Sequence, residues 1–232
     1  MFLFYFIIGS CFGSFVYLCA YRYRQPSLQI FHRSVCDLCH HPLSWKEMIP
    51  CLSWFYLYGK CRWCHSKIPI YSLFCELLGG ILSVLIFLCF DGKDVIGVYL
   101  VVFSLLYCSC TDILYGLIPD RTHVFLIFGA LFVLEPHEYL ISFLVFLAVF
   151  IVLYFINIIT EGLGWGDIKL ITCLSLLMKP YLLVFSIAIA SCSALIIFLP
   201  MFLQKKITRS TKIRFGPFLS FGALICLFFK LP

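Results

Sequence analysis

Charged residues are scarce in this chain of 232 residues: they make up 12% of it, whereas hydrophobic residues make up 63%. Soluble domains usually contain about 25% charged residues, so this scarcity excludes an ordinary soluble globule. The abundance of apolar residues also excludes an intrinsically disordered chain. The mean hydropathy of +1.06 predicts an integral membrane protein.

Acidic residues are fewer than basic ones, 11 against 17, and the formal net charge is +6. A positive charge is compatible with nucleic-acid binding. However, basic residues spread through so apolar a chain are more typical of the cytoplasmic loops of membrane proteins. We therefore expect a lipid bilayer around the chain and no nucleic-acid partner.

Long polar segments are few, and the apolar runs between them predict an all-α polytopic protein with about eight transmembrane helices. The predicted spans are 1–21, 73–90, 95–111, 122–134, 139–159, 168–178, 181–201 and 215–230. The first span lacks the basic start and the small-residue cleavage site of a signal peptide, so we expect it to be retained. The fourth and sixth are short, and a tilted or re-entrant segment would have the same pattern.

The distribution of Lys and Arg orients these spans. With eight crossings, 14 of the 17 basic residues lie in or beside the loops on one side, and Lys93, Lys179 and Lys230 lie on the other. Positive loops stay in the cytoplasm, so we expect both termini outside. The predicted domains are a first span at 1–21, a cytoplasmic cysteine loop at 22–72, a second span with its outer loop at 73–94, and a six-helix core at 95–232.

The long polar loop contains two C-x-x-C pairs, Cys36 with Cys39 and Cys61 with Cys64. Each pair lets two thiolates reach one ion from a single turn, and two pairs complete the tetrahedral site typical of structural zinc. A histidine follows each pair, so haem attachment is an alternative, as are redox-active thiols and cysteines with no bound group. A cytoplasmic location disfavours haem attachment and disulfides.

Three aspartates stand at the ends of apolar segments. Asp112 ends the third predicted span, Asp120 follows in the next loop, and Asp167 opens the sixth span. The predicted topology places Asp112 and Asp167 at the same depth, on the cytoplasmic edge. Two carboxylates brought together can perform aspartyl-protease chemistry, in which one polarises the scissile carbonyl and the other takes a proton from water.

The residues beside Asp167 favour a site that admits a peptide. Gly164 and Gly166 let a backbone approach closely, and Lys169 is placed to orient or tune the pair. In an alternative interpretation the aspartates are ordinary helix-end residues, with Asp167 as a helix cap and Asp112 in a loop. Two further alternatives are a proton-coupled transporter and a non-catalytic zinc-binding assembly factor, which would need the cysteines but not the aspartates.

In their order along the chain, these motifs resemble those of the type IV prepilin peptidases, which are polytopic aspartyl proteases of the GxGD type. The resemblance covers nearly the whole chain. It rests on Gly13-Ser14-Phe15, Arg33-Ser34-Val35-Cys36 with the two cysteine pairs, Glu76-Leu-Leu-Gly-Gly80, Asp112 with Pro119-Asp120, Gly164-Trp-Gly-Asp167-Ile-Lys169 and Phe215-Gly-Pro-Phe218. The compact size and short first loop are similar to the competence-type peptidases of Gram-positive bacteria.

The resemblance implies a multi-pass hydrolase of the bacterial cytoplasmic membrane that cleaves the basic leader from prepilin or pseudopilin precursors, with its active site facing the cytoplasm. It also implies that Asp112 and Asp167 are the catalytic pair, that Asp120 supports them, and that the cysteine loop binds structural zinc. Many members also methylate the new amino terminus with S-adenosylmethionine. Here Cys36-Asp-Leu-Cys39 departs from the family's Cys-Pro-x-Cys, which bears on methylation and leaves the aspartates and thiols unchanged.

Overall fold

The computed structural model describes residues 1–24, 34–92, 94–160, 162–204 and 213–229. Over these ranges the chain is helical, with two isolated bridges and no strand, which confirms the predicted all-α class. Some residues used in the charge and motif arguments lie outside the described ranges: Arg33, Lys93, Lys205, Lys206, Arg209, Lys212 and Lys230.

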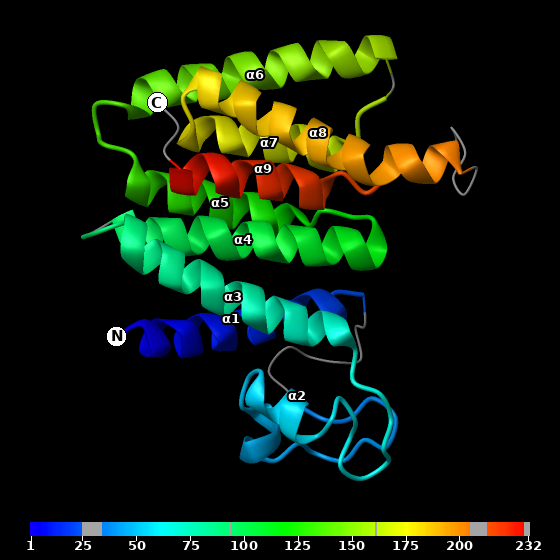
Figure 1. The fold of residues 1–232 in the computed structure, drawn as a ribbon. Helices are drawn as coiled ribbons and strands as arrows, with labels where there is room; N and C mark the ends of the chain where they lie inside the picture. Colours follow the sequence, from blue (N-terminus) through cyan, green and yellow to red (C-terminus); the bar gives the residue numbers. More distant parts are fainter. Residues whose placement is uncertain (25–33, 93, 161, 205–212, 230–232) are drawn as a thin grey trace. The chain divides into compact units, whose positions relative to one another are not determined.

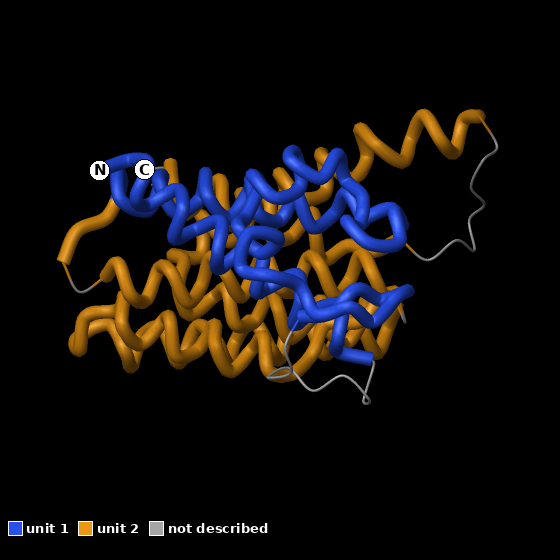
Figure 2. The backbone as a smooth tube through the Cα atoms, turned by 90° about the horizontal axis from the view of Figure 1, so that it is seen from below, with its two compact units in different colours: residues 1–89 blue, residues 90–232 orange. Residues whose placement is uncertain are grey.

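The chain divides into two compact units, residues 1–89 and residues 90–232 (Figure 2). In unit 1, helix α1 (Phe2–Arg22) packs along helix α3 (Ile70–Cys89), and the short elements η1 (Trp45–Met48) and α2 (Leu52–Tyr56) lie in the loop between them. A Cβ atom added to Gly9 or Gly13 would overlap backbone of α3. Small residues therefore let these two helices approach closely, as is common inside membranes.

Unit 2 is a bundle of the remaining helices: α4 (Asp94–Tyr115), α5 (Asp120–Val133), α6 (Tyr139–Thr160), α7 (Trp165–Leu177), α8 (Pro180–Leu203) and α9 (Gly216–Phe229). Its core is formed by buried side chains that include Leu105, Leu126, Leu170 and Leu219. Helix α6 differs because none of its side chains is buried, although nearly all of them are apolar. Such a helix suits a lipid environment.

Within the described ranges, eight helices of at least 13 residues coincide with the eight predicted spans. Five of them, α1, α3, α4, α6 and α8, are long and apolar enough to cross a membrane. Helix α7 has 13 residues and would extend about 20 Å at 1.5 Å per residue, which is shorter than the hydrocarbon core. The count of eight crossings therefore stays a prediction.

Helix α4 extends beyond the third predicted span. The span was expected to run to about residue 111 with Asp112 at its end, and the helix continues to Tyr115. Gly116 ends it, with a φ of 65° and a backbone N–H that donates to the Asp112 carbonyl at 2.8 Å. Asp112 is therefore a residue of the last helical turn. A charged side chain did not end the helix because the apolar residues after it continue the same pattern.

Four helix ends of unit 2 gather at the same end of the bundle (Figure 1). They are the end of α4, which carries Asp112, and the starts of α5, α7 and α9. These helices also pack against one another in the pairs α4 with α5, α4 with α9, α5 with α7 and α7 with α9. The fold thus brings segments that are distant in the sequence to one location.

Candidate functional site

Asp112 is held by the start of helix α9. Its side chain is only 6% exposed, and its Oδ2 atom accepts a hydrogen bond from the backbone N–H of Gly216 at 2.9 Å. A Cβ atom on Gly216 would lie 2.8 Å from that oxygen, so the close approach requires glycine. Arg214 acts electrostatically on Asp112, and its guanidinium donates to the carbonyl of Ile113. Sequence reasoning missed the roles of Gly216 and Arg214, although the motif at 215–218 belongs to the resemblance.

Asp167 lies in the first turn of helix α7 and is half-buried. The N-cap of this helix is Gly164, without a side-chain capping bond, so the alternative in which Asp167 caps the helix is wrong. The reason is geometric, because Asp167 is the third helical residue. A Cβ atom on Gly164 would lie 2.9 Å from the Asp167 Oδ2 atom. Each of the two aspartates is thus packed against a glycine.

The two carboxylates lie within electrostatic range of each other. The negative charge of Asp112 acts on the Asp167 carboxyl. Both charges also act on Cys108, a fully buried residue one turn before Asp112 on α4. Like charges at one site disfavour ionisation of both groups, which is the arrangement that aspartyl-protease chemistry requires.

Asp120 and Lys169 form an ion pair at the edge of this region. The Lys169 Nζ atom lies 2.6 Å from the Asp120 Oδ1 atom, and the two side chains are 47% and 80% exposed, respectively. The pair connects the first turn of α5 to the second turn of α7. Lys169 was expected to orient or tune the aspartate pair, and the contact that the structure gives it is with Asp120.

Gly166 lies where the connection from α4 to α5 touches helix α7. A Cβ atom on Gly166 would be 3.1 Å from the Cβ atom of Ile118, so this approach is also close. His123, in the first turn of α5, interacts with the backbone of Gly166. Sequence reasoning missed His123, because a single histidine in an apolar helix gives no signal of its own.

The two C-x-x-C pairs fold into the same turn. The backbone N–H of His40 donates to the Cys36 carbonyl at 2.9 Å, and that of His65 donates to the Cys61 carbonyl at 3.0 Å. Both histidines have left-handed backbone, with φ of 54° and 55°. An isolated bridge closes each turn, Val35 with Pro42 and Lys60 with Lys67. Each histidine therefore completes a turn through its backbone.

All four sulfur atoms of these turns converge, lying within 4.8 Å of one another. The Cys36 and Cys64 sulfurs are 3.7 Å apart, and the Cys39 and Cys61 sulfurs are 4.0 Å apart. A tetrahedral zinc ion with bonds of about 2.3 Å needs sulfurs about 3.8 Å apart, so the cluster fits this ion. One shared centre also suits a single ion better than two separately attached haems.

Hydrogen bonds favour the thiolate at two of the four cluster cysteines, Cys36 and Cys64, whereas the neighbouring cysteine sulfurs favour the protonated thiol at Cys39. A backbone hydrogen bond from Cys39 lowers the pKa of Cys36 to about 6. The Ser66 hydroxyl lowers the pKa of Cys64. Thiolates are the form in which cysteine binds metals.

Glu76 fastens the cysteine loop to the helix pair of unit 1. This side chain of α3 is 7% exposed, and its Oε2 atom accepts a hydrogen bond from the backbone N–H of Cys51 at 2.7 Å. Its Oε1 atom accepts from the Ser14 hydroxyl of α1 at 2.9 Å. Burial beside this carboxylate raises the pKa of the Cys51 thiol. One buried acid thus joins α1, α3 and the loop.

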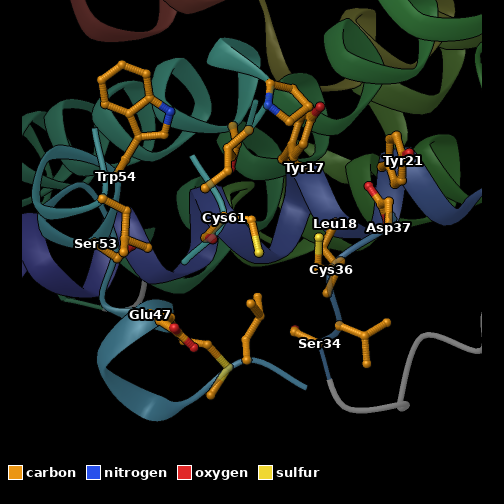
Figure 3. A pocket seen from close by; sticks show the side chains of 18 of the residues that line it. Tyr17, Leu18, Tyr21, Ser34, Cys36, Asp37, Glu47, Ser53, Trp54 and Cys61 are labelled. Carbon is orange, nitrogen blue, oxygen red and sulfur yellow. The ribbon is translucent and has the colours of Figure 1, made fainter. Parts of the chain in front are cut away.

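A cavity of about 430 Å³ lies in unit 1 between α1 and the cysteine loop. Figure 3 shows Tyr17 and Tyr21 of α1 on one side, with Trp54, Glu47 and Cys61 of the loop around it. Its volume is within the range of pockets that bind small organic molecules.

Two family models match the chain in succession. The model of the bacterial peptidase A24 N-terminal domain matches residues 7–90, and that of the type IV leader peptidase family matches residues 99–199. No solved structure shows a significant match.

Several curated proteins named prepilin leader peptidase/N-methyltransferase are similar to the chain. The protein of Aeromonas salmonicida is 28% identical over 205 residues, which are 84% of this chain and 70% of that protein. That of Vibrio cholerae is 29% identical, over 79% of this chain and 81% of its own length. That of Dichelobacter nodosus is 34% identical, over 61% of this chain and 53% of its own length. The chain therefore belongs to the type IV prepilin peptidase family and is a multi-pass membrane protease.

Proposed function

We propose that the chain is an aspartyl endopeptidase that removes the basic leader from type IV prepilins or pseudopilins, with Asp112 and Asp167 as its catalytic pair. The observation that carries this proposal is that the charge of Asp112 acts on the Asp167 carboxyl, at the end of unit 2 where α4 ends and α7 begins. The names of the curated relatives support the substrate class. Asp120, Gly164, Gly166 and Lys169 support the pair by holding the starts of α5 and α7.

In the proposed reaction the two carboxylates share one proton. The protonated carboxyl donates a hydrogen bond to the scissile carbonyl oxygen. The ionised carboxylate takes a proton from a water molecule, whose oxygen attacks the carbonyl carbon. The C–N bond of the tetrahedral intermediate then breaks, and the leaving nitrogen receives a proton from the pair. The hydrogen bond from Gly216 orients Asp112 for this attack.

The experiment that tests this function is cleavage of a prepilin-like substrate in membranes that contain the chain. The expected product lacks the basic leader, and mass spectrometry of its amino terminus locates the cut just before the apolar helix. Membranes without the chain provide the control. An uncut substrate at a normal level of folded chain would contradict the proposed function.

Replacing Gly216 by Ala is expected to lower the cleavage rate about tenfold to a hundredfold. The added Cβ atom would lie 2.8 Å from the Asp112 Oδ2 atom and displace the carboxylate, and a misplacement of about 1 Å can cost that much. Gly162→Ala is the matched control, because the nearest atom to its Cβ would be 3.7 Å away. The measurement is kcat at equal protein. Equal rates in the two variants would show that Gly216 does not set the position of Asp112.

The proposed site faces the cytoplasm at the membrane edge, as the one-sided distribution of basic residues supports. The apolar helix of the substrate would then remain in lipid while its leader reaches the aspartates. Inserting one helical turn, about 5.4 Å, between the apolar helix and the cleavage site should abolish cutting. The same insertion within the leader, beyond the scissile bond, is the control and should be cut. Normal cleavage of the substrate with the insertion between the apolar helix and the cleavage site would refute the location of the active site at the membrane edge.

We propose that Cys36, Cys39, Cys61 and Cys64 hold one structural zinc ion. The separations between the sulfurs support this assignment. When bound, the ion would order the loop and take no part in peptide hydrolysis, because four protein ligands leave no open position. The lipid bilayer and the prepilin are then the partners of the chain.

N-methylation of the new amino terminus is a second candidate activity, and the cavity in unit 1 is the observation that favours it. Its aromatic side chains Tyr17, Tyr21 and Trp54 suit the adenine ring of S-adenosylmethionine, and its carboxylates suit hydroxyl and ammonium groups. Saturable binding of S-adenosylmethionine to the purified chain, weakened by Trp54→Ala, is the expected result. Equal binding by both proteins would remove this cavity as the site.

A further inference from the structure

His123 is a buried titratable side chain that the proposed reaction does not use. It is 7% exposed, and both of its ring nitrogens are buried without a hydrogen-bond partner in the part of the chain that the structure describes. Buried polar groups in folded proteins are nearly always hydrogen-bonded, because burial removes their contacts with water. We therefore expect the imidazole to form a hydrogen bond in another conformation of the protein.

The surroundings of His123 identify that partner. The ring interacts with the backbone of Gly166 and of Asp120, and it lies within electrostatic range of the Asp120 and Lys169 side chains. The Asp120 backbone belongs to the same helix as His123, so of these two backbone contacts only the one with Gly166 joins the ring to α7. Asp120 and Lys169 already pair with each other at 2.6 Å. The carbonyl of Gly166 has a second lone pair that a helical hydrogen bond does not use. Gly166 directly precedes Asp167, so a hydrogen bond to this carbonyl would act on the peptide that carries the carboxylate.

The solvent-exposed ion pair between Asp120 and Lys169 contributes little to holding the start of α5 against the start of α7. Its side chains are 47% and 80% exposed, and exposed pairs contribute little because water screens them. A hydrogen bond made by the buried imidazole would not be screened in this way. Hydrogen bonds at active sites are often long in the free enzyme and shorten in the substrate complex. This behaviour accounts for a ring that lies beside Gly166 without ordinary hydrogen-bond geometry.

We propose that His123 is a positioning residue of the peptidase: in the substrate complex its ring N–H donates to the Gly166 carbonyl and fixes the turn that carries Asp167. The proposal rests on the proposed function, because it assigns Asp167 to the reaction. It adds a residue that acts through the backbone and touches neither water nor the scissile bond.

Steady-state cleavage by His123→Leu, His123→Asn and His123→Gln tests the proposal, with kcat and KM measured separately on the full chain. Leucine fills the space of the ring but cannot donate a hydrogen bond, so kcat should fall about tenfold to a hundredfold while KM stays within about twofold. At least one amide variant, which can donate, should recover most of the rate. His137→Gln, at an exposed histidine in the connection between α5 and α6, is the matched control and should cleave at the native rate.

A merely structural role predicts the opposite order, because an apolar residue is tolerated in a buried site better than an amide. Native kcat in His123→Leu, or amide variants no better than leucine, would overturn the proposal. Asp112→Asn is assayed in parallel to separate the two claims. If Asp112→Asn still cleaves, the proposed function fails and the role of His123 fails with it. If Asp112→Asn is inactive and His123→Leu is native, only the role of His123 is refuted.

Discussion

Replacement of either Asp112 or Asp167 by Asn is expected to lower prepilin cleavage by about 10³-fold or more. Asparagine keeps the size of the side chain but can neither take a proton from water nor give one to the leaving nitrogen. Each substitution alone should suffice, because the two carboxylates act as one unit that shares a proton. For Asp112, the backbone N–H of Gly216 can still donate to an amide oxygen, so the local fold should persist.

The measurement is cleavage in membranes at matched expression, with the folded amount of each variant quantified. Asp91→Asn provides the same chemical change at an exposed residue just before α4, at the end of that helix opposite to Asp112, and should cleave normally. Cleavage by both variants would show that the aspartates are not catalytic. If the aspartate variants keep normal function and only replacement of a cluster cysteine abolishes it, the assembly-factor alternative is favoured. Loss of solute flux in the aspartate variants would favour a transporter.

Cys61→Ser is expected to remove the zinc ion, reducing the metal content from about one ion per chain to nearly none. Cys61 is the most buried of the four cluster cysteines, and a serine hydroxyl binds zinc poorly at neutral pH. Structural zinc sites contribute about 10 kcal/mol or more of apparent binding free energy, which is also folding free energy for a loop with little core. The amount of folded protein should therefore fall sharply.

Metal analysis and alkylation of the remaining cysteines in the purified protein provide the readouts. Cys36, Cys39 and Cys64 should become reactive once the ion is lost, whereas the activity per folded molecule should stay near the native value. Cys192→Ser, an exposed cysteine of α8, is the control and should retain the metal. Full metal content in Cys61→Ser would show that the cluster does not bind zinc as proposed. A loss of activity per folded molecule would show that the cysteine loop contributes to cleavage as well as to the stability of the protein.

The sequence alone was sufficient to predict the helices and the cysteine cluster. Long apolar runs and the residues that interrupt them are local properties, so the eight predicted segments coincide with eight helices of the described ranges. The C-x-x-C spacing is local as well, because each pair closes a turn within six residues. Helix α4 runs past Asp112 to Tyr115, because a single charge does not outweigh the helical pattern on both sides of it. The catalytic roles of Asp112 and Asp167 stay predictions.

Only the tertiary structure showed which groups contact these residues. Three contacts depend on how α4, α5, α7 and α9 pack. Gly216 donates to Asp112, Lys169 pairs with Asp120, and His123 lies beside Gly166. The anchoring of Cys51 by Glu76 has the same origin. Composition and periodicity describe one segment at a time, whereas these contacts join residues far apart in the chain. Their geometry is set by the close packing of helices, in which the absence of a single Cβ atom decides whether two groups can meet.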